Sequence, residues 1–398
     1  MSVIVLKFGG SSVATPEHLR KVAAKVTALR EAGHLPVVVV SAMGKTTDGL
    51  LSLASEVSGH PHRRELDMLL STGERISMAL LTMAIRDCGH EAISLTGSQA
   101  GIITTTDHNQ ARIIEVRPIR VHEALEKGRI VIVGGFAGVS TDKEVTTLGR
   151  GGSDTTAISL AAALDAPECW ICSDVDGVYT ADPRVVPEAR KIDALSHGEV
   201  LEMGLRGAKV LAPEAIDYAR RHGVTLHARA SFTDGRGTVI THRPHPGVGR
   251  AVAVAGDRTA LPVAVDAGTT TLSEFFAWLG QEGVRWKDAR RHQTGSSARV
   301  ELVVDTLNTP DGGALIADYW RSRAGDCVVH EDLRTATIVG EGIAEQAPMW
   351  GHATDALANL GIECPALVGN AWGLTAQVPE HQLDDVVRAW HGALPSVG

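Results

Sequence analysis

The first 245 or so residues alternate short, continuously apolar runs rich in β-branched residues with amphipathic segments of helical period. This alternation is the sequence form of βαβ units, in which helices cover both faces of a buried parallel sheet. The predicted strands are Ser2–Phe8, Pro36–Ser41, Glu91–Leu95, Ile130–Gly134, Cys169–Asp174 and Val224–Ala228. We therefore expect an α/β domain around a mainly parallel sheet.

Several helix ends can be predicted from single residues. Thr15 followed by Pro16 is typical of an N-cap with proline at the first helical position, and Gly33 is expected to end that helix. Ser196 with Glu199 predicts a capping box. Glu74 follows Ser71 at the same spacing, so a structural role as a cap is open for it beside a role as a ligand.

A change of pattern marks the end of this block. The segment His242–Gly249 has two prolines and two glycines, which predicts a boundary after a catalytic domain of residues 1–245. The order strand, helix, strand, strand, helix, strand then occurs twice, and predicts two split-βαβ modules at 250–323 and 324–398. Helices are expected at Thr271–Gln281, Asp311–Arg321, Pro348–Asn359 and Glu380–His391, with β-rich runs at Ala298–Asp305 and Thr335–Val339.

Composition excludes several classes of function. A chain of 398 residues with 44% hydrophobic content is large enough for more than one core. Its net charge of −9, with no basic run to offset it, argues against nucleic acid and anionic membrane as partners. We find no signal-like leader and no apolar run of membrane-spanning length. Five scattered cysteines suggest a reducing cytoplasm, and Cys169 and Cys172 are expected to be core residues rather than a metal pair.

The segment Val5–Val13 carries the first chemical signal. A buried strand delivers Lys7 and then Gly9 and Gly10 directly before a helix, an arrangement that lets backbone N–H groups and an ammonium approach a phosphate. An ordinary strand end and turn would explain this segment alone equally well. Gly44-Lys45-Thr46 is not a Walker A loop, because valine occupies position 39, where that loop requires glycine.

The segment Leu148–Thr156 carries the second signal. Arg150 lies among three glycines, where its planar fork suits a carboxylate, and Asp154 suits an ammonium or lysine partner. Ser153 or Asp154 as a simple N-cap is the alternative, but it leaves Arg150 unexplained. Beside Arg150, a role for Glu74 in binding a substrate ammonium becomes attractive. The hydroxyls of Ser41 and Thr47 are suited to a ligand at the carboxyl end of the sheet.

A third segment, Ser173–Arg184, follows a predicted strand and is suited to wrapping around a nucleotide. Asp174 would contact a hydroxyl, Tyr179 the base and Arg184 the phosphates. The pattern lacks the third acidic or amide residue and the final glutamate of an EF-hand, so calcium is not expected. Lys209 is a further cation for the phosphates, although a solvated lysine at a helix end is its ordinary interpretation.

In this order and spacing the segments resemble the aspartate kinases of the amino-acid kinase family. The matching blocks are Lys7–Val13, Val40–Asp48, Leu70–Glu74, Gly149–Asp154, Ser173–Tyr179, Gly207–Leu211 and the domain ending Arg229–Ile240, so that the resemblance covers residues 1 to about 241. It implies a three-layer αβα amino-acid kinase fold with a mainly parallel sheet. It also implies C-terminal ferredoxin-like (ACT-like) α+β modules, which in this family bind lysine or threonine and join a homodimer or higher homo-oligomer.

The resemblance further implies a reaction and its residues. The γ-phosphoryl group of ATP would pass to the side-chain carboxylate of L-aspartate, giving 4-phospho-L-aspartate, the first step toward lysine, threonine and methionine. The implied catalytic residues are Lys7, Asp154 and Lys209. The implied substrate ligands are Ser41, Thr47, Glu74, Arg150, Ser153 and Asp154. The implied ATP ligands are Lys7, Phe8, Gly9, Gly10, Ser173, Asp174, Tyr179, Arg184, Lys209 and Val210. Mg²⁺ would be held mainly through the nucleotide, with no direct metal ligand predicted.

The second half departs from the family pattern. The effector loop of Asp-Lys-Pro-Gly type is present only as Asp266–Gly268, and Gly342–Pro348 lacks the usual Pro-Gly pair, so the feedback site is expected to be altered. Ala212 also replaces a usual histidine. Two alternatives to aspartate kinase are a paralogue acting on a related acidic amino acid, such as a glutamate derivative, and a non-catalytic amino-acid sensor. The sensor predicts lost phosphate ligands, whereas Lys7 and Lys209 are present.

Overall fold

The computed structural model describes residues 2–242, 249–267, 269–294, 297–323 and 325–394, and divides the chain into two compact units. Unit 1 is Met1–Val178, Lys191–Leu201 and Leu211–His245; unit 2 is Tyr179–Arg190, Glu202–Val210 and Pro246–Gly398. The sequence predicts one continuous domain over 1–245, whereas 179–190 and 202–210 belong to unit 2. Residues 243–248 of the predicted boundary segment lie outside the described residues.

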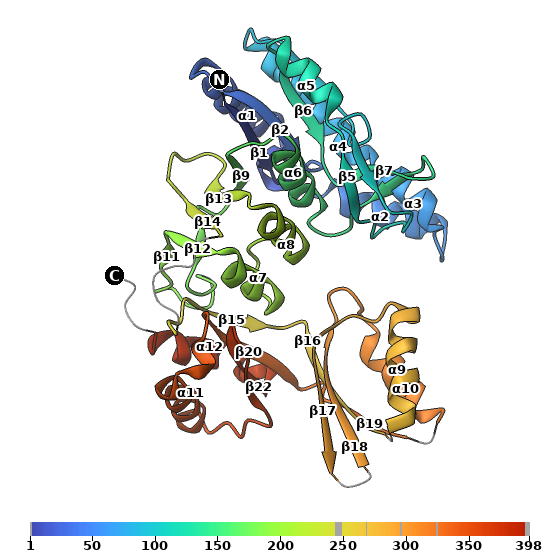
Figure 1. Cartoon of the computed structure of the whole chain (residues 1–398), viewed down its shortest axis with the longest axis vertical. Helices are drawn as coiled ribbons and strands as arrows, with labels where there is room; N and C mark the ends of the chain where they lie inside the picture. Colours follow the sequence, from blue (N-terminus) through green and yellow to red (C-terminus); the bar gives the residue numbers. More distant parts are fainter. Residues whose placement is uncertain (1, 243–248, 268, 295–296, 324, 395–398) are drawn as a thin grey trace. The chain divides into compact units, whose positions relative to one another are not determined.

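An eight-stranded sheet forms the centre of unit 1, in the order β12-β14-β13-β9-β1-β2-β6-β3 (Figure 1). All six strands predicted for residues 1–245 are in it, and their pairs are parallel, which confirms the predicted α/β class. Strands β13 and β14 form an antiparallel pair toward one edge. The strand bounds are β1 Val3–Phe8, β2 Leu35–Val40, β3 Ala92–Leu95, β6 Ile130–Gly134, β9 Glu168–Ser173, β12 Ala194–Ser196, β13 Thr225–Ala230 and β14 Thr238–Thr241.

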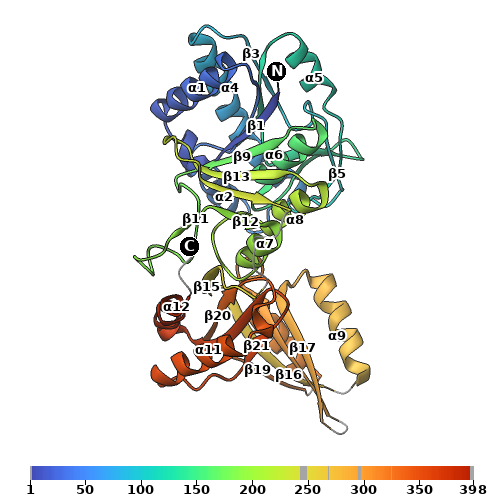
Figure 2. The ribbon, with the colours of Figure 1, turned by 60° about the vertical axis from the view of Figure 1, so that its left-hand side comes forward.

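Helices cover both faces of this sheet, giving the predicted three layers (Figure 2). Leu6 and Phe8 of β1 are buried with residues of α1 and α4, whereas Lys7 points to the other face and meets Asp154 of α6. This follows from the alternation of side chains along a strand. The helices of unit 1 are α1 Pro16–Glu31, α2 Thr46–Val57, α3 Arg63–Leu70, α4 Thr72–Asp87, α5 Ile119–Glu126, α6 Gly152–Ala163 and α8 Pro213–His222, while α7 His197–Leu205 spans a unit boundary.

The predicted helix ends are confirmed in two places. The Thr15 side chain accepts a hydrogen bond from the backbone N–H of His18, and Gly33 adopts φ 91° after α1. At the start of α7, the Ser196 N–H donates to Glu199 at 2.7 Å and the Glu199 N–H donates to the Ser196 hydroxyl at 3.1 Å. These two bonds are the reciprocal pair of a capping box.

The segment around Ser71 differs from a helix start. Ser71 is itself helical, and its hydroxyl donates to the Met68 carbonyl at 3.0 Å instead of capping α4. Helices α3 and α4 therefore form one stretch, Arg63–Asp87, and the interpretation of Glu74 as part of a cap is wrong. By length and composition this stretch of 25 residues could cross a membrane. Leu81 and Ile85, however, are buried in the core of unit 1.

The remaining strands that begin in unit 1 form two smaller sheets. One has the order β5-β4-β7-β8, and β8 leads directly into the glycine-rich turn before α6. The other pairs β10 with β11. Their bounds are β4 Ile102–Thr104, β5 Ile113–Val116, β7 Ala137–Ser140, β8 Val145–Thr147, β10 Val178–Tyr179 and β11 Lys191–Ile192.

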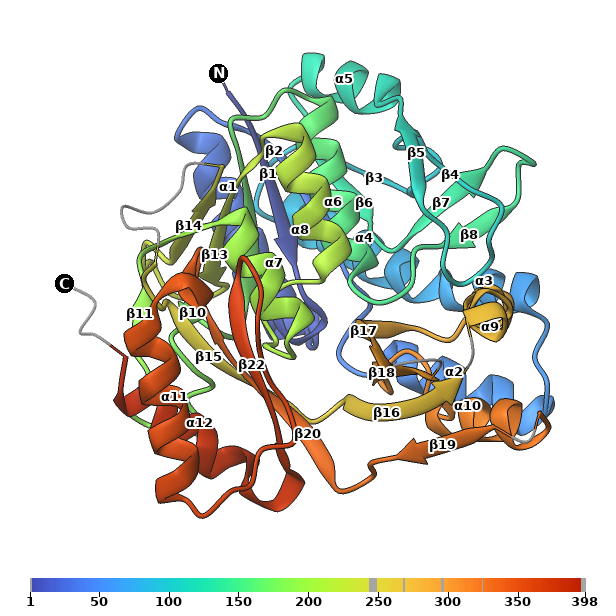
Figure 3. The same ribbon diagram turned by 60° about the horizontal axis from the view of Figure 1, so that its bottom comes forward.

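Unit 2 contains two four-stranded sheets, as the predicted ferredoxin-like modules require (Figure 3). In the first, the chain order β16, α9, β17, β18, α10, β19 gives the antiparallel sheet β17-β18-β16-β19, which is the ferredoxin-like arrangement. The bounds are β16 Ala260–Ala267, α9 Thr269–Glu282, β17 Trp286–Thr294, β18 Ser297–Asp305, α10 Gly312–Arg321 and β19 Asp326–Val329. Gly268 of the predicted effector loop lies outside the described residues.

The second module is assembled from separate parts of the chain. Its sheet has the order β15-β20-β22-β21, with β15 antiparallel to β20. Strand pairing therefore differs from the predicted division at 323/324, because 260–329 is inserted between β15 and β20. Strand β15 supplies the fourth strand that the later elements lack. The bounds are β15 Ala253–Asp257, β20 Leu333–Val339, α11 Ala347–Asn359, β21 Leu367–Gly369, β22 Gly373–Pro379 and α12 Leu383–Gly392.

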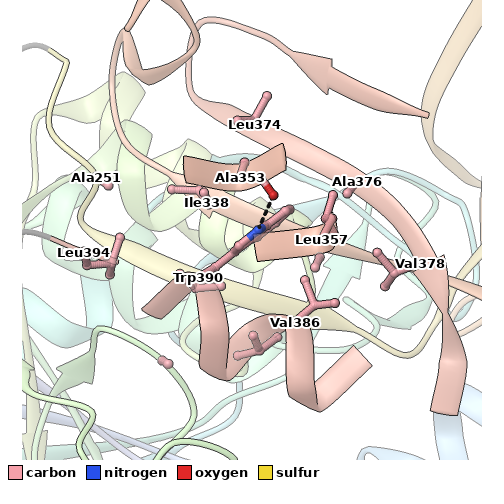
Figure 4. Close-up of a cluster of buried hydrophobic side chains, with 14 of the residues drawn as sticks. Ala251, Ile338, Ala353, Leu357, Leu374, Ala376, Val378, Val386, Trp390 and Leu394 are labelled. Atoms are coloured by element: carbon pink, nitrogen blue, oxygen red, sulfur yellow. Dashed lines mark hydrogen bonds between the residues drawn. The ribbon is translucent and has the colours of Figure 1, made fainter. Parts of the chain in front are cut away.

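The core of the second module lies between its sheet and helices α11 and α12. Trp390 of α12 is 1% exposed, and Figure 4 shows its ring among Leu357, Leu374 and Val386. Its indole N–H donates to the Ala353 carbonyl at 3.2 Å, so the polar atom of this large side chain is satisfied. The module thus has a core of its own.

Candidate active site

Strand β1 brings Lys7 beside a carboxylate near the carboxyl end of the sheet. Lys7 Nζ lies 2.7 Å from Asp154 Oδ1, and the two side chains are 13% and 12% exposed. Gly10 must be glycine here, because a Cβ at this position would lie 2.9 Å from the Ala42 carbonyl oxygen. The Gly44 N–H donates to the Gly10 carbonyl at 3.0 Å, so the loops after β1 and β2 are joined through their backbones. A cation is therefore held at the carboxyl end of the parallel sheet, where such folds bind ligands.

Glu74 is buried with only one of its two oxygens satisfied. It is 5% exposed, and Oε1 accepts a hydrogen bond from the Ala42 N–H at 3.1 Å. Oε2 is buried and has no hydrogen-bond partner among the described residues. Burial raises the pKa of the Glu74 carboxyl from 4.5 to about 7. A buried, half-satisfied carboxylate is costly in an empty protein and suits a cationic ligand.

A glycine pair at the end of β6 separates Glu74 from the start of α6. A Cβ at Gly134 would lie 3.4 Å from the Glu74 Cβ, and one at Gly135 would lie 2.8 Å from the Ser153 Cβ. A pocket beside these glycines is lined by Ser71, Glu74, Met78, Thr96, Gly134 and Gly135, among others. The structure thus places Lys7, Ser153, Asp154 and Glu74 at one edge of the sheet. Sequence reasoning missed Gly134-Gly135, although this pair follows a buried strand just as Gly9-Gly10 does.

The turn that carries Arg150 depends on left-handed glycines. Gly149 and Gly151 have φ values of 74° and 71°, and Gly151 is the N-cap of α6. Ser153 and Asp154 lie in the first turn of the helix rather than at its cap, so their interpretation as simple N-caps is wrong. Arg150 is exposed, which leaves its guanidinium accessible to a ligand.

Ser41 and Thr47 flank the loop after β2. The Ser41 N–H donates to the Phe8 carbonyl at 3.1 Å, which ties the end of β2 to the end of β1. The Ser41 carbonyl accepts a hydrogen bond from the Ser77 hydroxyl of α4 at 2.7 Å. Thr47 is in the first turn of α2, and both predicted substrate ligands are half-buried.

Two predicted nucleotide residues of unit 1, Ser173 and Asp174, lie at the end of β9. The Gly9 N–H donates to the Cys172 carbonyl at 3.3 Å, so the ends of β1 and β9 are adjacent. Ser173 accepts a hydrogen bond from the Val175 N–H at 3.1 Å, which forms a local turn, and Asp174 is exposed. This turn lies on the edge of the sheet that also carries Lys7.

Other predicted nucleotide residues, Tyr179, Arg184, Lys209 and Val210, belong to unit 2. The Arg184 guanidinium donates two hydrogen bonds to the Asp182 carboxylate, from Nε to Oδ1 at 3.0 Å and from Nη2 to Oδ2 at 2.6 Å. The hydrogen bond from Arg184 lowers the pKa of the Asp182 carboxyl, and the charge of Lys209 adds to this effect. Asp182 therefore orients Arg184 through two side-chain hydrogen bonds, a contact that sequence reasoning missed.

The cysteine pair is part of the core, as predicted. Cys169 and Cys172 are fully buried free thiols, and burial raises the pKa of Cys172 to about 11. Neither is therefore a ready thiolate. Within the described ranges, no group of three or more His, Cys, Asp or Glu side chains is arranged to hold a metal ion.

Comparison with known proteins decides the family. The model of the amino acid kinase family matches residues 2–228. The aspartokinase of Geobacillus stearothermophilus is 38% identical over 398 residues, covering 99% of this chain and 97% of that protein. The chain belongs to the amino acid kinase family, among its aspartokinases. The aspartokinase of Thermus thermophilus is 36% identical, covering 99% of this chain and 98% of that protein.

Other members of the amino acid kinase family match in part or in fold. The aspartokinase of Mycolicibacterium smegmatis is 57% identical over 241 residues, and this match spans 60% of the present chain but only 57% of that relative's length. Among solved structures, E. coli aspartokinase III in complex with aspartate and ADP has a TM-score of 0.82 at 24% identity, covering 98% and 99% of the two chains. That likeness establishes the fold of this aspartokinase-family chain.

Proposed function

We propose that this chain is an ATP-dependent aspartate kinase that converts L-aspartate to 4-phospho-L-aspartate. The proposal rests on two charged groups at one edge of the sheet. One is the ammonium of Lys7, held by Asp154, and the other is the carboxylate of Glu74, of which Oε2 has no partner among the described residues. A transferring phosphoryl group needs a cation such as Lys7, and the ammonium of an amino acid needs a carboxylate such as Glu74. Aspartate and ADP in the E. coli aspartokinase III structure, which has the same fold, support this choice of ligands.

The reaction requires positioning rather than a base. The side-chain carboxylate of aspartate, already ionised near neutral pH, attacks the γ-phosphorus, and the bond from that phosphorus to the bridging oxygen of ADP breaks. We assign neutralisation of the transferring group to Lys7. Glu74 would accept the substrate ammonium and Arg150 would bind its α-carboxylate through a bidentate fork. The sequence assigns ATP contacts also to Lys209, and we keep that as part of the proposal.

The residues present fit Mg²⁺ that arrives with the nucleotide. Mg²⁺ is usually bound through one or two carboxylates, substrate phosphates and waters, and needs no dedicated protein cage. Asp154 supplies a carboxylate at the start of α6, and the part of the chain that the structure describes has no cluster of three acidic, His or Cys ligands. When bound, the ion would neutralise charge on the β- and γ-phosphates. EDTA should then abolish activity and added Mg²⁺ restore it.

Trapping of the acyl phosphate tests the proposal. The purified chain with ATP, Mg²⁺ and L-aspartate should give a hydroxamate in the presence of hydroxylamine, and Lys7→Met should give almost none. Parallel reactions with L-glutamate and with modified aspartates separate a paralogue of different specificity. Absence of hydroxamate with every acid, while the protein is folded, would favour a non-catalytic sensor and contradict the proposal.

Three accompanying proposals concern the whole protein. We propose assembly into a homodimer or higher homo-oligomer through the two ferredoxin-like modules, which light scattering at several concentrations would test. We propose an altered effector response, tested by adding lysine and threonine to the hydroxamate assay. Five free thiols support a cytoplasmic setting, because a reducing compartment keeps cysteines unpaired.

A further inference from the structure

Asp67 is a buried charge in unit 1 that the proposed reaction does not use. It lies on α3 and is 0% exposed. His108 Nδ1 lies 2.6 Å from Oδ2, the Asn109 N–H donates to Oδ1 at 3.1 Å, and the Thr147 hydroxyl donates to Oδ1. A carboxylate without solvent is expensive unless donors surround it, and here both oxygens are satisfied. This donor set shows a site built around Asp67.

The partners of Asp67 come from two segments that meet beside Arg150. His108 and Asn109 are in the loop between β4 and β5, and Thr147 is the last residue of β8. Asn109 has φ 68°, a left-handed conformation that its bond to Asp67 helps to hold. The loop also lies close to the turn after β8, because a Cβ at Gly149 would lie 3.2 Å from the Asn109 carbonyl oxygen.

Arg150 follows Thr147 by three residues, with left-handed Gly149 between them. The Thr147 carbonyl accepts a hydrogen bond from the Ala111 N–H at 2.9 Å, so both its side chain and its backbone are fixed. The turn that carries Arg150 is therefore anchored at its N-terminal end by Asp67. At its C-terminal end it is anchored by the start of α6.

The same helical stretch also carries Glu74. Asp67 and Glu74 are seven residues apart on Arg63–Asp87, which is about two turns of helix. Glu74 is the proposed ligand for the substrate ammonium, and Arg150 the proposed ligand for its α-carboxylate. One rigid stretch thus bears one ligand directly and fixes the other through Asp67 and Thr147.

We propose that Asp67 is a positioning residue for the amino-acid substrate, acting through Thr147 and the Asn109 loop on Arg150. This inference rests on the proposed function, since Arg150 must be a substrate ligand for Asp67 to matter in this way. Asp67 does not touch the reacting atoms. Its role is to hold the guanidinium at the spacing from Glu74 that an α-amino acid requires.

Asp67→Asn tests the inference, because asparagine keeps the volume but replaces one acceptor with a donor that faces His108 and the Asn109 N–H. We expect the KM for aspartate to rise about ten- to hundredfold while the KM for ATP changes by less than about threefold. Thr147→Val, which removes only the hydroxyl, should give a smaller rise of the same kind. Glu65→Gln, an exposed residue of the same helix, is the matched control and should leave both constants unchanged.

A double-mutant cycle shows whether Asp67 acts through Arg150. In an Arg150→Ala background, Asp67→Asn should have little further effect on kcat/KM for aspartate, because the side chain that it positions is gone. Full additivity, or equal losses for aspartate and ATP, would overturn the inference. If Asp67→Asn does not fold, Thr147→Val and its cycle with Arg150→Ala decide. A wild-type protein that makes no hydroxamate would instead refute the proposed function, so the two failures are distinguishable.

Discussion

Replacing Glu74 by glutamine should stabilise the empty protein at alkaline pH while weakening its binding of aspartate. In the wild-type protein Glu74 is 5% exposed, with Oε2 buried and without a partner among the described residues, so its ionised form is disfavoured in the folded state. Glutamine has nearly the same shape and can still accept the Ala42 N–H. It carries no charge that must be desolvated, but it cannot attract an ammonium group.

The size of the effect follows from the pKa of Glu74, which is raised from 4.5 to about 7. Between these values the folded protein binds more protons than the unfolded chain, so the free energy of unfolding falls as pH rises through this window. One pKa unit corresponds to about 1.36 kcal/mol, so the free energy of unfolding is lower by about 3 kcal/mol once the pH is above 7. Below pH 4.5 the carboxyl is neutral in both the folded and the unfolded state, so its burial no longer lowers the free energy of unfolding.

Thermal unfolding of the ligand-free proteins between pH 5 and pH 8 measures this. The Tm of Glu74→Gln minus that of the wild type should increase with pH, whatever constant cost the buried amide adds. Saturating aspartate should raise the Tm of the wild type and not that of the variant. A Tm difference that is the same at pH 5 and pH 8 would refute the reasoning. The exposed control Glu65→Gln should follow the wild type throughout.

Three further perturbations separate the roles assigned to charged residues. Lys7→Met should lower kcat about hundredfold or more, and an unchanged kcat in the hydroxamate assay would contradict its catalytic role. It should also lower the Tm, because the buried carboxylate of Asp154 loses the ammonium now 2.7 Å away, so kcat is compared on protein shown to be folded at the assay temperature. Arg150→Lys should raise the KM for aspartate about tenfold because the bidentate fork is lost; a KM equal to that of the wild type would exclude this contact. In unit 2, Lys287→Met leaves buried Asp257 without the ammonium now 2.6 Å away, so urea titration should show a loss of about 3 kcal/mol, and no shift in midpoint would exclude it.

The central fold was predictable because its middle strands, such as β2 and β6, are buried on both faces. Continuous runs such as Val37–Val40 cannot be solvent-facing, and the six runs predicted as strands within residues 1–245 are all in the central sheet. The peripheral strand β14 alternates buried and half-buried residues over only four positions, so it gave no comparable signal. Strand β15 was harder still, because its pattern indicates a strand but not its partner β20, which follows only after a complete inserted module.

Local motifs were less reliable than buried runs at the site. Ser196 and Glu199 form the capping box that their spacing predicts, whereas Ser71 and Glu74, at the same spacing, do not. The difference lies in the chain before the motif: the residues before Ser71 are already helical, so no free N–H groups remain to be capped. Glu74 is consequently free to turn toward the loop after β2, and no four-residue pattern could show this.

Asp67 and Glu74 lie on the same helical stretch, but their carboxylates differ in how far hydrogen-bond donors surround them. Both carboxylates are nearly inaccessible to solvent, at 0% and 5% exposure. Donors from His108, Asn109 and Thr147 surround Asp67, whereas a single backbone N–H reaches Glu74. Burying Glu74 in this state lowers stability near neutral pH, so packing alone does not account for it. A cationic group that enters the pocket and completes the coordination of Oε2 does account for it, and the ammonium of an amino acid has the required charge and hydrogen-bond donors.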